Sequence, residues 1–181
     1  MKLHYNSPAI LSFTLVCIFV LILDNFYPVV ESLFTVYPVF SPSDPLWYPR
    51  LVTHAIGHQN WSHLAGNFAF ILLIGPILEE KYGSKKLLIM MLITAGLTAL
   101  LNILLFNTAL LGASGIAFML ILLGSFTNYK SGHIPLTFVL ILVMYLGKEV
   151  FDSFNSDRVS QFAHLIGGFC GGVFGFYFNR R

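Results

Sequence analysis

The stretch AHLIGGFCGGVFGF, residues 163 to 176, carries a histidine and three glycines spaced by four within an apolar run. Residues four apart lie on one face of a helix, so Gly167, Gly171 and Gly175 form a groove beside the face that carries His164. Small residues let a second helix approach closely inside a membrane. The stretch therefore predicts a tightly packed membrane helix with an ionisable group next to its packing groove.

The composition indicates a membrane protein. Of the 181 residues, 56% are hydrophobic and 10% are charged, and the mean hydropathy is +0.78. The net charge is only +2, and the basic residues fall in short loops or at the termini, which argues against nucleic acid as a partner. Cys17 and Cys170 both lie in apolar runs, so we interpret them as packed thiols and assign neither a disulfide nor a metal site.

Six apolar runs approach the roughly 20 residues that a helix needs to cross a bilayer. We therefore expect an all-α, polytopic membrane protein with a single domain over residues 1–181. The first run could also be a signal peptide, but no small-residue cleavage site follows it, so we expect the run to be retained. The expected helices cover residues 9–27, 62–79, 87–106, 112–129, 134–151 and 160–178.

The long segment between the first two runs, residues 27–60, contains Phe40, Trp47 and Tyr48, and we expect it to lie among the lipid headgroups, anchored by aromatic rings. Basic residues set the orientation. A cytoplasmic N-terminus places seven Lys and Arg residues inside and three outside, which the positive-inside rule favours. We therefore expect a multi-pass protein of the cell membrane with both termini in the cytoplasm. Glu79 and Glu80 fall at an inner helix end, where we interpret both as solvated at the interface.

In this topology the second, fourth and sixth runs carry polar residues at one depth in the outer leaflet. These residues are His63 and Asn67, Ser114, and His164, roughly 5 to 10 Å below the surface. A lone serine in a membrane helix usually bonds its own backbone, but an ionisable imidazole there is costly and normally has a polar partner and a function. The three runs together predict a functional site.

A serine and a histidine on neighbouring helices suggest a nucleophile and a general base, because imidazole can accept the hydroxyl proton near neutral pH. Gly112 and Gly115 make the fourth run a suitable neighbour for the glycine groove, so we expect Ser114 to lie within hydrogen-bond reach of His164. Acyl transfer also requires donors for the developing oxyanion, each contributing about 3 kcal/mol. The candidate donors are the Ser114 N–H, the Asn67 amide and the His63 imidazole. The three runs offer no acidic residue near their outer ends, so a dyad is expected rather than a triad.

These residues resemble the rhomboid family of intramembrane serine proteases, and the resemblance covers nearly the whole chain. The family's GxSG motif is similar to Gly112-Ala113-Ser114-Gly115, its HxxxN pattern to His63 and Asn67, and its AHxxGxxxG pattern to Ala163, His164, Gly167 and Gly171. His54 and His58 resemble the histidine-rich segment before the second helix. Residues 78–88, LEEKYGSKKLL, resemble the connection between helices two and three.

The resemblance implies a six-helix rhomboid-like bundle, a Ser114–His164 dyad, no cofactor and no metal. It also implies cleavage of single-span transmembrane proteins near the outer membrane surface, in a water-filled cavity open to the outside. The residues expected to support the site are His58, Gly112, Gly115, Phe118, Gly167 and Gly171. The chain departs from the family pattern twice: Phe118 replaces a tyrosine that stacks on the catalytic imidazole, and Pro49 rather than tryptophan precedes Arg50.

Three other functions agree less well with the sequence. A metalloprotease could use His54, His58 and His63, but His63 lies five residues after His58, about 140° around a helix, and HExxH is absent from the sequence. A non-catalytic relative that binds or escorts transmembrane clients would be expected to lack the serine or the histidine. A channel or transporter would need more charge within the membrane.

Overall fold

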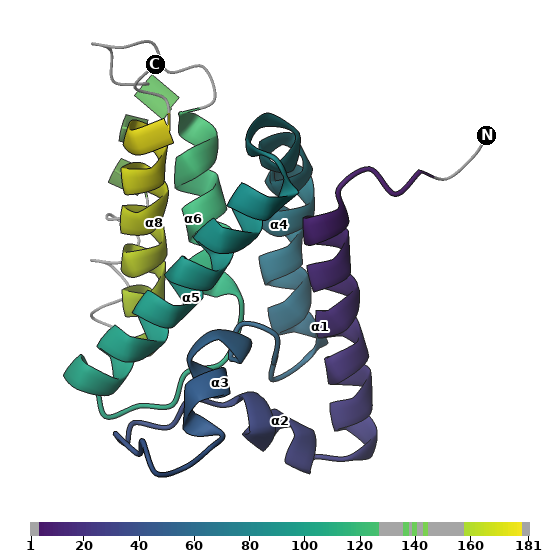
Figure 1. Cartoon of the computed structure of the whole chain (residues 1–181), viewed down its shortest axis with the longest axis vertical. Helices are drawn as coiled ribbons and strands as arrows, with labels where there is room; N and C mark the ends of the chain where they lie inside the picture. The colour runs from purple at the N-terminus through teal and green to yellow at the C-terminus, as the bar shows by residue number, and fades with distance from the viewer. Residues whose placement is uncertain (1–3, 127–135, 138, 141–142, 145–157, 179–181) are drawn as a thin grey trace.

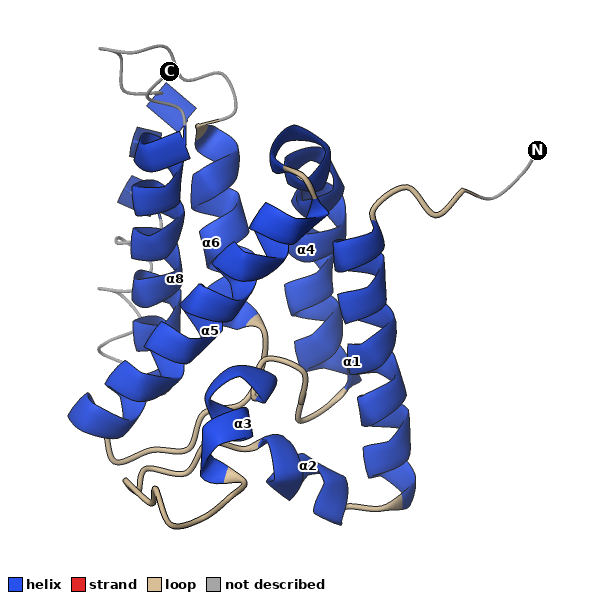
Figure 2. Cartoon of the chain, viewed as in Figure 1, coloured by secondary structure: helices blue, strands red, loops and turns tan. Residues whose placement is uncertain are grey.

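The computed structural model describes residues 4–126, 136, 137, 139, 140, 143, 144 and 158–178, and in these residues the protein is a helical bundle without strands (Figures 1 and 2). The predicted all-α fold is confirmed. The expected helix over 134–151 falls largely outside the described residues. The helices are α1 (Pro8–Phe26), α2 (Val29–Phe34), α3 (Trp47–Thr53), α4 (Trp61–Tyr82), α5 (Ser84–Leu105), α6 (Ser114–Ser125) and α8 (Arg158–Phe178).

The long helices are arranged as two pairs with a third element across them. Helices α6 and α8 lie side by side, α1 and α4 lie side by side, and α5 crosses in front of the space between the pairs in Figure 1. By length and composition α1, α4 and α5 can each span a membrane, and α6 is a shorter apolar helix. The bundle therefore brings the starts of α4 and α6 to the same end as the short helices α2 and α3.

The segment between α1 and α4 is ordered by Arg50. Its guanidinium pairs with Asp44 at 3.0 Å and donates to the Ser32 carbonyl at 3.1 Å. Val36 and Leu110 exchange two backbone hydrogen bonds, which tie this segment to the chain just before α6. The segment therefore contains short helices and fixed contacts that hydropathy alone did not indicate.

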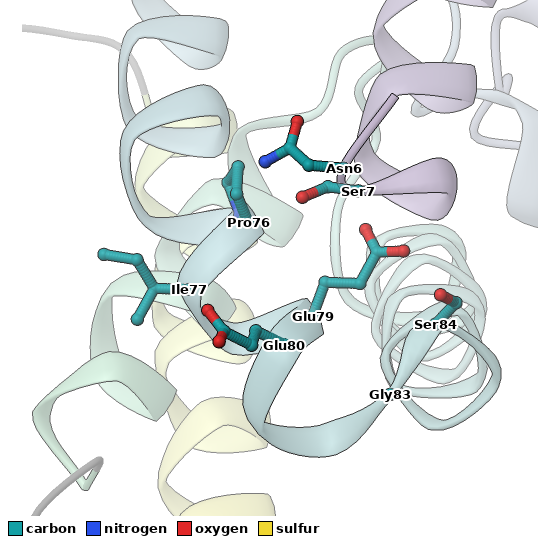
Figure 3. A pocket seen from close by; sticks show the side chains of 8 residues that line it. All are labelled: Asn6, Ser7, Pro76, Ile77, Glu79, Glu80, Gly83 and Ser84. Carbon is teal, nitrogen blue, oxygen red and sulfur yellow. The ribbon is translucent and has the colours of Figure 1, made fainter. Parts of the chain in front are cut away.

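The α1–α4 pair is closed by a glycine and a carboxylate. Gly75 faces Ile10, whose Cδ1 would lie 2.6 Å from a Cβ at position 75. One turn further on, Glu79 is buried, and its two oxygens accept the backbone N–H groups of Ala9 and Ile10 at 2.8 and 2.9 Å. Figure 3 shows this carboxylate pointing toward the start of α1 beside Ser7. The predicted interfacial solvation is therefore wrong for Glu79, because its oxygens satisfy the otherwise unbonded first turn of α1.

The helices α6 and α8 pack more closely than α1 and α4. A Cβ at Gly167 would meet the backbone carbonyl of Gly115, one at Gly171 would meet the carbonyl of Met119, and one at Gly175 would meet the Phe126 ring. The glycine groove predicted from the spacing of four is therefore confirmed. The cysteines are packed as expected: Cys17 and Cys170 are buried and free.

Candidate active site

Ser114 is the first residue of α6 and is half-buried. The turn that delivers it depends on Gly112, whose φ of +118° is a conformation that side chains rarely adopt. Space imposes the same requirement, because a Cβ at Gly112 would lie 2.7 Å from Cε1 of His63. The turn is held by the Gly112 N–H, which donates to the His54 carbonyl at 2.9 Å. Glycine at this position therefore sets both the direction of α6 and the closeness of α4.

His164 lies on α8, beside the point where α8 packs closely against the start of α6. A Cβ at Gly115 would lie 3.2 Å from the Ala163 carbonyl, so the residue after Ser114 adjoins the residue before His164. The imidazole stacks on Phe118, with ring centroids 4.3 Å apart and an interplanar angle of 35°. Phe118 is four residues after Ser114 and therefore on the same face of α6. The structure thus brings the predicted nucleophile and base to adjoining positions on two packed helices.

The predicted oxyanion donors come from the start of α4. Asn60 caps this helix, its side-chain oxygen accepting the His63 N–H at 2.8 Å. Nε2 of His63 and Nδ2 of Asn67 both lie beside Gly112, 2.8 and 3.7 Å from where its Cβ would stand. Three helices therefore converge on the GxSG turn.

Two further histidines are buried in the segment between α3 and α4. His58 contacts the Ile56 carbonyl through Nδ1 and the Asn67 amide through Nε2, each at 3.1 Å. His54 contacts the Ala95 carbonyl through Nε2 at 3.2 Å. Burial lowers the pKa of each imidazole to about 4, so both are neutral at neutral pH. In the part of the chain that the structure describes, these histidines do not converge with other ligands on a metal-sized site.

Thr98 on α5 adjoins the site, and it was not among the residues predicted from the sequence. Oγ1 of Thr98 would lie 3.3 Å from a Cβ at Gly115. Asn102 donates to the Thr108 carbonyl at 2.8 Å, while its own side-chain oxygen is buried without a partner among the described residues. Thr94, Thr98 and Asn102 are spaced by four in the sequence, so the signal for a polar face on α5 was present.

A cavity of about 550 Å³ is not part of this site. It is lined by the segment before α1, the last turns of α4 and the start of α5, including Ser7, Pro76 and Glu80 (Figure 3). Pro76 follows His63 by 13 residues, which is about 20 Å along a helix. The cavity therefore lies at the opposite end of the bundle from the candidate active site.

Comparison with known proteins gives concordant matches. A model of the rhomboid domain matches residues 46–181. Rhomboid-like protein 11, chloroplastic, from Arabidopsis thaliana is 30% identical over 158 residues, which cover 85% of this chain and 51% of that protein. Rhomboid protease GlpG from Haemophilus influenzae is 22% identical over 144 residues, which cover 77% of this chain and 74% of that protein. The chain thus spans about half the length of the first relative and about three quarters of the second.

Proposed function

The chain belongs to the rhomboid family, and from this premise we propose that it is a serine endopeptidase that cleaves single-span transmembrane proteins inside the bilayer. It is an integral membrane protein, and its similarity to a rhomboid protease supports intramembrane proteolysis at the level of the family. The observation that carries the proposal is the α6–α8 contact, in which Gly115 meets Ala163 and Phe118 stacks on His164. This contact joins the helices that carry Ser114 and His164 and so supports their assignment as a dyad.

The proposed reaction uses Ser114 as nucleophile and His164 as general base. The imidazole accepts the hydroxyl proton while the serine oxygen bonds the scissile carbonyl carbon. It then donates that proton to the leaving amine as the C–N bond breaks, which yields an acyl-enzyme. A water molecule, deprotonated by the same imidazole, hydrolyses the ester and restores the serine.

The oxyanion would be bound at the GxSG turn. Nε2 of His63 and the amide of Asn67 both adjoin Gly112, and Ser114 begins α6. The first N–H groups of a helix have no acceptor within it, and the helix dipole favours negative charge there. Together, Nε2 of His63, the amide of Asn67 and the backbone N–H of Ser114 can stabilise the tetrahedral intermediate.

The proposed substrate is a transmembrane helix that unwinds locally. A scissile carbonyl bonded within a helix is not accessible, so small or helix-breaking residues near the cleavage site favour attack. Ser114 lies at the start of α6, which our orientation puts near the outer membrane surface, with both termini in the cytoplasm. We propose the cell membrane as the location of the protein.

The decisive experiment reconstitutes the purified protein in liposomes with a single-span substrate. We expect Ser114→Ala and His164→Ala each to lower the cleavage rate by at least about 1,000-fold. Ser125→Ala is a matched control on the same helix, because its hydroxyl donates to the Leu122 carbonyl at 2.6 Å. His4→Ala, at an exposed position, is the matched control for the histidine.

Two further arms separate the alternatives. A fluorophosphonate should label the wild-type protein and not Ser114→Ala, since only an activated serine reacts. A metal chelator should leave cleavage unchanged. Cleavage that survives in Ser114→Ala, or substrate binding by the wild type without cleavage or labelling, would overturn the proposal in favour of a metalloprotease or a non-catalytic binder.

A further inference from the structure

We infer that His58 is a positioning residue that fixes the side-chain amide of Asn67 with an N–H directed at the oxyanion. This inference rests on the proposed function, because it concerns the donor role of Asn67. His58 does not adjoin the GxSG turn through any described contact of its own, so it would act through Asn67.

The contacts of His58 determine which of its nitrogens carries the proton. Nδ1 lies 3.1 Å from the Ile56 carbonyl, which can only accept, so Nδ1 must be the protonated nitrogen. Nε2 of the neutral ring is then an acceptor, and it lies 3.1 Å from Nδ2 of Asn67. The two contacts are therefore mutually consistent only in one tautomer of His58 and one orientation of the Asn67 amide.

That orientation has a consequence for catalysis. One N–H of Asn67 is used by His58, and the second N–H of the same nitrogen remains for another acceptor. The nitrogen is on the side of Gly112, 3.7 Å from where a Cβ would stand. The flipped amide would present its oxygen there, which would repel an oxyanion rather than bind it. Among the described residues His58 is the hydrogen-bond partner of the Asn67 side chain, and it thus selects the productive orientation of the amide.

His58 is itself held rigidly. The residue is 2% exposed, its ring packs edge-on against His63 with centroids 5.1 Å apart, and it lies tilted against Phe68 with centroids 5.8 Å apart. Burial lowers its pKa to about 4, which keeps the acceptor on Nε2 available at neutral pH. A charged ring would have donors on both nitrogens and could not accept from Asn67.

Two amide substitutions separate the two contacts of His58. In His58→Gln the terminal amide oxygen can take the place of Nε2 and accept the N–H of Asn67. In His58→Asn the shorter amide can take the place of Nδ1 and donate to the Ile56 carbonyl, but it does not reach Asn67. We expect kcat of His58→Gln to stay within about fivefold of wild type. We expect His58→Asn to lower kcat by about 10- to 100-fold, less than the full loss of a donor, with KM changed less than about twofold.

A double-mutant cycle distinguishes positioning from a structural role. In an Asn67→Ala background, His58→Asn should lower kcat by less than about twofold further, because the group it orients is absent. His54→Asn is the matched control: His54 is equally buried but contacts the Ala95 carbonyl instead of Asn67. Its effect should be the same in both backgrounds.

The outcomes distinguish a failure of this inference from a failure of the proposed function. Equal losses from His58→Asn with and without Asn67, or equal activity of the Gln and Asn variants, would overturn the positioning role while leaving the dyad intact. Full cleavage by Ser114→Ala would overturn both. Thermal unfolding of each variant identifies any loss of activity that reflects unfolding alone.

Discussion

The two helix pairs of the bundle both cross at glycines, but the glycines face different groups. Gly167 of α8 faces a backbone carbonyl of α6, which is fixed by its helix and cannot move aside. Gly75 of α4 faces only side-chain atoms of Ile10, whose Cδ1 and Cγ1 would lie 2.6 and 2.9 Å from an added Cβ. The α1–α4 pair is instead fixed by the buried carboxylate of Glu79. The pair that carries the proposed dyad is thus set by backbone contact, and the other by a hydrogen-bonded charge.

The largest expected difference comes from adding one methyl group to each crossing. Gly167→Ala must push α6 and α8 apart, and we expect it to lower the free energy of unfolding by more than about 3 kcal/mol and to abolish cleavage. Gly75→Ala must displace the buried Ile10 side chain but no backbone, and it gains helix propensity, so we expect a loss of about 1 to 2 kcal/mol, smaller than that of Gly167→Ala. Denaturant titration in micelles, followed by circular dichroism, measures both. Equal effects would contradict the distinction between backbone and side-chain contact.

The next test removes the carboxylate that fixes the α1–α4 pair. Glu79→Ala leaves the buried N–H of Ile10 and the half-buried N–H of Ala9 without acceptors, so we expect a loss of about 3 kcal/mol in unfolding free energy. The proposed active site lies at the other end of α4, so the folded fraction should still cleave substrate. Glu80→Ala is the matched control, since Glu80 is exposed and should contribute less than about 0.5 kcal/mol. A selective loss of kcat in Glu79→Ala would show that the two pairs are not independent.

Acid should destabilise the end of the bundle that carries His54 and His58 without acting on the glycine crossings. Because burial lowers the pKa of His54 and His58 to about 4, the unfolded chain binds more protons than the folded one between pH 6.5 and about 4. Stability therefore falls as the pH falls through this window, with a slope of up to about 1.4 kcal/mol per pH unit for each histidine. Unfolding measured as a function of pH should show a smaller slope in His54→Asn. An unchanged slope would mean that this histidine is charged in the folded protein.

The smallest expected effect concerns the ring that stacks on the proposed base. Phe118→Leu removes the aromatic contact with His164, and we expect kcat to fall by about three- to tenfold, as a stacking energy near 1 kcal/mol implies. Phe118→Tyr keeps the ring and should stay within about threefold of wild type. Steady-state cleavage in liposomes compares the two. A larger loss in the tyrosine variant would indicate that the added hydroxyl displaces His164.

The sequence predicted the helices because each described span is a long apolar run, and it predicted the α6–α8 contact because glycines at intervals of four must share a helix face. It did not predict α2 and α3, which are short and lie in a segment held by Arg50. Nor did it predict the polar face of α5, although Thr98 and Asn102 show the spacing of four. Periodicity identifies which residues share one face of a helix, but it does not identify the element against which that face packs.

Residue order by itself determined that the chain is an all-helical membrane protein and which residues are candidates for the dyad, because hydropathy and helix periodicity are local properties. The tertiary structure alone decided the environment of Glu79 and the pairing of His58 with Asn67. Glu79 is 69 residues from Ile10, whose N–H it accepts. His58 and Asn67 are nine residues apart, and His58 precedes α4, so no helical spacing relates them. Buried polar groups must find partners, but which partner lies within reach depends on how separate segments pack.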